Sequence, residues 1–205
     1  FIGGGTYWWV AIRWKPPPSI FDSPVDDALG YLALPDFNKL PVEERLKFLL
    51  ELADRFRGLQ PQESAAAAAF LAGVVGPARA QLHENARTLA KDVLAGAAAE
   101  YIDLPEEQRG PFIDKWVADW MRLGERMTRG EERPRSDDER LAEARRDIQR
   151  NRDRVAEDGG PPPPSDRIAS RFMDFWQSEV EQASSPKEQG QIVRFMNDVR
   201  KRLTR

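Results

Sequence analysis

Leu40-Pro41-Val42-Glu43-Glu44-Arg45 opens a stretch of the chain in which apolar side chains recur every three or four residues. Leu104-Pro105-Glu106-Glu107-Gln108-Arg109 repeats the phrase, and Ser185-Pro186-Lys187-Glu188 is a looser third version. Proline suits the first helical position because its φ is already helical and it has no N–H to leave unsatisfied. Acidic residues in the first turn favour the positive end of the helix dipole. The phrase therefore predicts the starts of amphipathic helices and an all-α fold.

Start and stop signals divide the chain beyond Pro18 into further helices. Prolines open these segments, and glycines or prolines close them. We expect helices that begin at Ser23-Pro24, at Pro41, at Pro61 and at Ala78, the last of which runs to about Tyr101. Val, Ile, Thr and aromatic residues form no bounded alternating run beyond residue 14, so the sequence predicts no sheet.

Gly110-Pro111 lies just inside the second copy of the phrase. Proline in a helix interior removes a hydrogen bond and restricts the residue before it. We therefore expect Pro105 to Arg109 to form one separate turn, followed by a helix from Pro111 to about Met127. The segments 41–56 and 105–120 are either an internal duplication or two independent uses of one start signal.

Composition divides the chain into five segments. The expected organisation is an irregular multi-helix bundle followed by a charged helix and a C-terminal helical hairpin, with a possible truncated transmembrane helix in front. The segments are 1–15 (the possible membrane anchor), 16–129 (the bundle), 130–158 (the charged helix), 159–165 (a Gly/Pro spacer) and 166–205 (the hairpin).

The charged segment has only three large apolar residues between Glu131 and Asp158, spaced seven apart. Ser136 followed by Glu139 is a capping box that predicts its helix start. Acids and arginines three apart contribute only about 0.2–0.5 kcal/mol per pair, which favours an exposed helix but builds no core.

The hairpin predicted beyond residue 165 carries large apolar faces. Its first helix has Ile168, Phe172, Phe175, Trp176 and Val180, and its second has Ile192, Phe195, Met196, Val199 and Leu203. These faces need a partner. They either complete the bundle across the charged helix, or form a separate hairpin that pairs with another protein or another copy of the chain.

The amino-terminal segment has no charge before Arg13. Twelve residues span about 18 Å as a helix, short of a hydrocarbon core of about 30 Å. Its far side carries Tyr7, Trp8, Trp9 and Trp14 beside Arg13 and Lys15, the composition of a membrane interface. We expect the end of a single transmembrane anchor whose first half precedes Phe1. The alternative is a packed strand or arm of a soluble domain.

Bulk composition narrows the classes of partner. The 205 residues carry a net charge of −3, so no global positive field recruits nucleic acid or anionic lipid. There is no cysteine, which excludes disulfides, thiolate metal sites and cysteine nucleophiles. Arginine exceeds lysine, and Ala and Pro are abundant, which is typical of a GC-rich bacterial coding sequence.

Motifs that carry chemistry are few. His83 is the only histidine, and Arg87 occupies the position at which a zinc-protease pattern needs its second histidine. The paired carboxylates Glu43/Glu44 and Glu106/Glu107 are explained by the helix dipole. We therefore predict no catalytic, cofactor-binding or metal-binding residue and no enzymatic activity.

The sequence predicts a membrane-anchored helical protein that acts as a scaffold or protein-interaction module, with a protein partner or self-association. The expected protein contacts are aromatic: Trp116, Trp120, Phe172, Phe175 and Trp176. The alternative is a nucleic-acid or anionic-lipid binder through a basic carboxyl end: Arg194, Arg200, Lys201, Arg202 and Arg205. The expected location is the bacterial inner membrane, with a single crossing. Arg13 and Lys15 favour a cytoplasmic soluble part under the positive-inside rule, and a more basic flank upstream would reverse that side.

Overall fold

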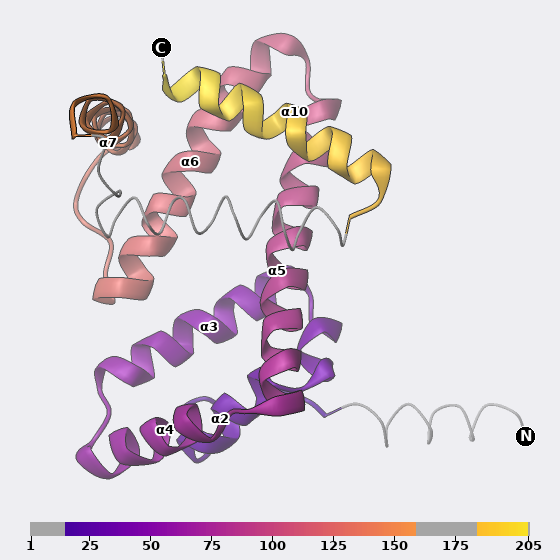
Figure 1. Ribbon diagram of the computed structural model, residues 1–205, viewed down its shortest axis with the longest axis vertical. Coiled ribbons are helices and arrows are strands. Elements are labelled where there is room, and N and C mark those ends of the chain that lie inside the picture. Colours follow the sequence, from indigo (N-terminus) through magenta and orange to yellow (C-terminus); the bar gives the residue numbers. More distant parts are fainter. Residues whose placement is uncertain (1–14, 159–183, 205) are drawn as a thin grey trace, which may run out of the picture. The chain divides into compact units, whose positions relative to one another are not determined.

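The computed structural model describes residues 15–158 and 184–204 (Figure 1). Over these residues the chain forms helices and no strand, which confirms the all-α prediction. The elements are α2 (Val25–Leu32), the 3-10 helix η1 (Pro35–Lys39), α3 (Val42–Arg57), α4 (Pro61–Gly73), α5 (Gly76–Asp103), α6 (Glu106–Arg129), α7 (Asp137–Asp158) and α10 (Pro186–Leu203).

The predicted helix starts are present. Pro41 and Pro105 occupy the N-cap positions of α3 and α6, one residue before the position predicted for proline, and two acids follow each of them. The capping box at the start of α7 is also formed. The backbone N–H of Ser136 donates to Glu139 Oε2 at 2.8 Å, and the backbone N–H of Glu139 donates to Ser136 Oγ at 3.2 Å.

The separate turn predicted before Pro111 is wrong, because α6 runs without a break from Glu106 to Arg129 with Pro111 inside it. Two local features explain this. The missing N–H would have bonded the carbonyl of Glu107, an exposed residue whose carbonyl oxygen water can satisfy. Gly110 has no Cβ to meet the proline ring, so the usual restriction on the preceding residue is relaxed.

The chain divides into two compact units, Phe1–Leu89 and Ala90–Arg205. The division falls within α5, where the sequence has no break signal. The boundaries predicted near residues 129 and 158 rest on composition and stay predictions.

In the amino-terminal unit the core forms between α2, η1, α3 and α4. The rings of Tyr31, Phe37 and Phe48 pack pairwise at centroid distances of 5.5–6.3 Å. The buried members are Ile20, Val25, Ala28, Leu29, Tyr31, Phe37, Leu40, Phe48, Leu52 and Ala67.

A buried polar cluster ties the start of α5 to the end of α2. Asn85 Nδ2 donates to the carbonyl oxygens of Leu32 at 2.7 Å and Leu34 at 2.8 Å. Its Oδ1 accepts from Asn38 Nδ2 at 2.7 Å and from Gln81 Nε2 at 2.8 Å. The amide of Asn85 therefore satisfies backbone carbonyls that the end of a helix leaves without an intrahelical partner.

In the carboxyl-terminal unit, helices α5, α6, α7 and α10 share one core. The buried members are Leu94, Ala98, Tyr101, Ile113, Val117, Leu141, Ile192, Phe195 and Val199. Three of these belong to α10, so the predicted second helix of the hairpin packs into the unit. The predicted first helix, the Gly/Pro spacer 159–165 and the aromatic segment before Trp14 lie outside the described residues.

Among the described residues, no single helix is both long and apolar enough to cross a bilayer. Helices α4 and α5 meet that criterion only when taken together, and they are bent by 98° at the break between them.

Candidate interaction surfaces

Helix α6 brings two of the predicted aromatic contact residues together. The rings of Trp116 and Trp120 lie 5.9 Å apart, and Trp116 packs edge-on against the buried ring of Phe195 at 5.0 Å. Trp116 is half-buried, whereas Trp120 keeps 36% of its surface exposed. Trp120 is thus an exposed aromatic side chain that rests on a packed one. Phe172, Phe175 and Trp176 lie outside the described residues.

Two of the basic residues at the end of α10 have carboxylate partners. Arg202 donates from Nε to Asp114 Oδ1 at 3.1 Å and from Nη2 to Asp114 Oδ2 at 2.7 Å. This bidentate pair raises the pKa of Arg202. Arg194 and Arg200 are exposed, and Arg205 lies outside the described residues.

Asp198 adds a second carboxylate among these basic residues. It accepts from Tyr101 Oη at 2.9 Å and from Lys201 Nζ at 3.2 Å. Burial raises the pKa of Asp198, but the hydrogen bonds from Tyr101 and Lys201 outweigh burial and lower it on balance. Asp198 and Asp114 therefore offset part of the positive charge that the sequence places at this end.

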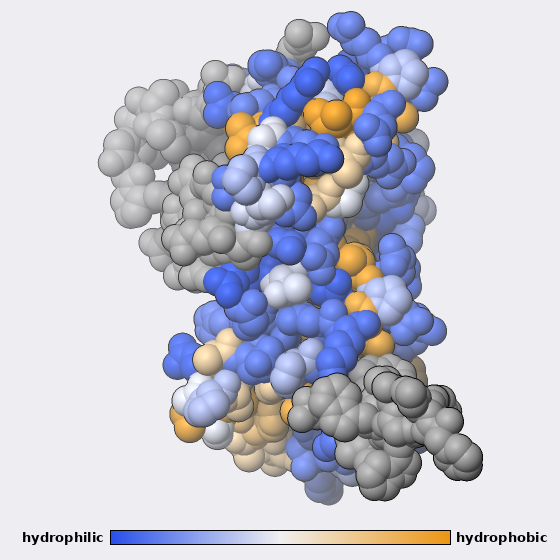
Figure 2. Space-filling view, turned by 90° about the vertical axis from the view of Figure 1, so that its right-hand side faces the viewer, coloured by the Kyte–Doolittle hydropathy of each residue, from blue (hydrophilic) through white to orange (hydrophobic). Residues whose placement is uncertain are grey.

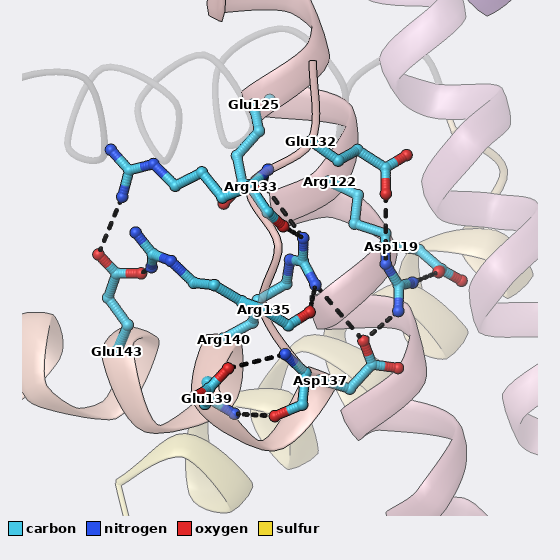
Figure 3. A network of polar contacts seen from close by, with 12 residues as sticks. Asp119, Arg122, Glu125, Glu132, Arg133, Arg135, Asp137, Glu139, Arg140 and Glu143 are labelled. Atoms are coloured by element: carbon cyan, nitrogen blue, oxygen red, sulfur yellow. Dashed lines mark hydrogen bonds and ion pairs between the residues drawn. The ribbon is translucent and has the colours of Figure 1, made fainter.

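A network of arginines and acids joins α6 to α7 (Figure 3). Its centre is Arg140, which is 2% exposed. Its Nη2 donates to Glu125 Oε2 at 3.1 Å and to the carbonyl oxygen of Arg133 at 2.8 Å, and its Nη1 donates to the carbonyl oxygen of Arg135. Glu125 Oε2 also accepts the backbone N–H of Arg133 at 3.0 Å. Arg140 thus holds the connection between the two helices in one conformation.

The outer part of this network is made of ion pairs. Arg122 bonds Asp119 and Asp137, and Arg135 bonds Glu143. The sequence pattern of acid and base three residues apart suggested exposed pairs along α7. Arg140 bonds Glu125 of α6 and two carbonyl oxygens of the loop between the helices instead, because it lies on the buried side of α7 beside Leu141. These arginines therefore link α6, the following loop and α7.

A surface that the sequence did not predict as a site lies where α4 meets α5. Residues 64–78, all of which the structure describes, contain no charged residue. Ala67 is buried and Phe70 packs against the core of the amino-terminal unit, but Leu71 is 59% exposed and Val75 67%. We call residues 64–78 the apolar corner. Figure 2 shows that tan and orange residues gather in patches on the face of the protein that it draws.

Comparisons of the chain with protein-family models, with curated proteins and with solved structures found no match. His83 is exposed on α5, and the pairs Glu43/Glu44 and Glu106/Glu107 lie exposed in the first turns of their helices.

Proposed function

We propose that the protein is a non-enzymatic interaction module that is held at a membrane and binds a protein partner through exposed apolar side chains of its helices. The observation that carries the protein-binding part is Trp120. Tryptophan dominates interface energetics when it is partly exposed and held in place. The contacts of Trp116 with Trp120 and with Phe195 supply that support.

The membrane part of the proposal is supported by the sequence from Tyr7 to Lys15, in which Tyr7, Trp8, Trp9 and Trp14 lie close to Arg13 and Lys15, as at a bilayer interface. Under the positive-inside rule, Arg13 and Lys15 favour a cytoplasmic location for the rest of the chain. The proposed location is the inner membrane of a bacterium, with a single crossing.

The alternative function, binding of nucleic acid or anionic lipid through α10, has less support. Phosphate affinity depends on a net positive field. Asp114 engages Arg202, and Asp198 engages Lys201, so two of the four described basic residues have a carboxylate partner.

The protein-binding part is tested by photo-crosslinking inside cells. A benzoylphenylalanine replaces Trp120 in the full chain, and a second variant carries it at Lys115, whose side chain is 75% exposed on the same helix. We expect a discrete crosslinked species from position 120 that position 115 does not give. Identical patterns at the two positions, or no adduct at 120, would contradict the proposal.

A further inference from the structure

We propose that the apolar corner, residues 64–78, rests in the interfacial layer of a lipid bilayer. This inference builds on the proposed membrane location and adds a second point of contact to it. A surface helix ordinarily carries polar side chains on its outer face. Beyond its first turn, α4 carries none there.

The exposed face of the corner is as apolar as its buried face. Ala65, Ala68, Ala69 and Ala72 are exposed along α4, and Leu71 and Val75 project at the bend. A helix that is apolar all round belongs either in a protein core or in lipid. The core of the amino-terminal unit covers only one side of α4, through Ala67 and Phe70. The exposed Leu71 and Val75 are the side chains that gain most from an apolar environment on the other side.

The composition of the corner favours lipid over a protein partner. Its exposed residues are Ala, Gly, Pro, Leu, Val and one Ser, and none is the Trp, Tyr or Arg that dominates protein interfaces. The 98° bend between α4 and α5 places Leu71 and Val75 close to a change of chain direction. Arg79, which is exposed, follows the corner directly, where a basic side chain can meet lipid phosphate.

The corner is connected to the expected anchor through α2. Tyr31 Oη donates to the carbonyl oxygen of Lys15, the last residue of the aromatic and basic segment, at 3.2 Å. On the same helix, Gly30 and Ala33 line an apolar groove of about 370 Å³ together with Phe70 and Val74 of the corner. The end of the anchor segment and the corner therefore contact neighbouring residues of α2, within one unit of the protein.

Because these 205 residues contain no cysteine, a single introduced cysteine carries the label at one known position. The full chain carries an environment-sensitive fluorophore at Val75→Cys, and a matched control carries it at Val193→Cys, an exposed valine of α10. Both are mixed with phosphatidylcholine vesicles and separated by flotation. We expect the chain to float, with blue-shifted emission at position 75 that quenchers in the acyl chains reduce, and aqueous emission at position 193.

A further variant, Leu71→Asp with the label at Val75→Cys, separates apolar insertion from mere proximity. Leu71 is exposed, so the fold is retained, as circular dichroism would confirm. We expect the ratio of inserted to free label at position 75 to fall by about tenfold, the effect of losing one large apolar side chain from the interface. If the chain floats but both labels show aqueous emission, the insertion of the apolar corner is contradicted and the membrane anchor is still supported. A chain that does not float would overturn the membrane part of the proposed function and, with it, this inference.

Discussion

At the scale of single residues, Asn85 is the polar side chain on which the amino-terminal unit most depends. Asn85→Asp removes both N–H donors and leaves the carbonyls of Leu32 and Leu34 unpaired beside a buried charge. We expect the free energy of unfolding to fall by about 2–4 kcal/mol. Urea denaturation measures it, with His83→Asp as the control on the exposed side of the same helix. Equal effects of the two substitutions would show that the Asn85 hydrogen bonds contribute little.

Tyr101 and Asp198 make stability depend on pH in a defined direction. The pKa of Asp198 is lowered in the folded state, so its contribution is present above the unfolded value of about 3.9 and is lost as the pH falls through the folded value. Tyr101→Phe removes one of the bonds to this carboxylate. We expect the substitution to cost about 1 kcal/mol at pH 7 and less below pH 4. A cost that stays constant between pH 7 and pH 3 would argue against the ionised Asp198 as the acceptor.

Asn85 also shows where sequence reasoning stops at this scale. Its partners Asn38 and Leu32 lie 47 and 53 residues away in the sequence. No local sequence pattern predicts hydrogen bonds between residues so far apart. Arg140 is similar, because the acids and arginines three residues apart in the charged segment predicted exposed pairs, whereas the buried Arg140 bonds Glu125 of α6. Whether a polar residue is buried depends on tertiary packing, which spacing alone does not encode.

At the scale of elements, the helix starts were predictable because a proline, a capping side chain and first-turn acids act within four residues of each other. The prediction of a break at Pro111 was wrong because it rested on the same kind of local signal alone. The local rule states the cost of a proline in a helix, but α6 stays continuous because its apolar face, with Ile113 and Val117, packs into the core. The alanine run of α4 was equally ambiguous, since alanine is found in helices on the surface and in the core.

The junction of α6 and α7 tests one such tertiary link. Arg140→Lys keeps the charge but cannot reach Glu125, Arg133 and Arg135 at once. We expect a loss of about 2–4 kcal/mol in the free energy of unfolding. The control is Arg146→Lys at an exposed position of the same helix, which we expect to change it by less than about 0.5 kcal/mol. A fully stable Arg140→Lys protein would mean that the buried network is dispensable.

Substitutions in α10 distinguish a structural role of its basic residues from anion binding. Arg202→Ala leaves Asp114 without its bidentate partner, and we expect it to cost about 1 kcal/mol, since the guanidinium is partly exposed. Arg200→Ala, on the exposed side, serves as the matched control. Thermal unfolding and filter binding to RNA are measured on both. Unchanged stability together with equal losses of RNA binding would favour the alternative function.

At the scale of the whole molecule, charge and exposed apolar surface are distributed unevenly along the chain. Residues 64–78 carry no charge, whereas the α6–α7 junction is built from arginines and acids. The overall composition predicted a helical protein with a large solvated surface. It did not predict that the uncharged residues 64–78 would remain largely exposed in the amino-terminal unit. A composition averaged over the chain does not say where along the chain the apolar residues lie.

The most direct test of the proposed function is fractionation of the protein in the cells that make it. Membranes are pelleted and washed with high salt and then with alkaline carbonate, and protease is added to intact and lysed cells. We predict that the protein stays in the pellet through both washes and is cleaved only after lysis. Recovery in the supernatant at low and at high salt would contradict a membrane-held module.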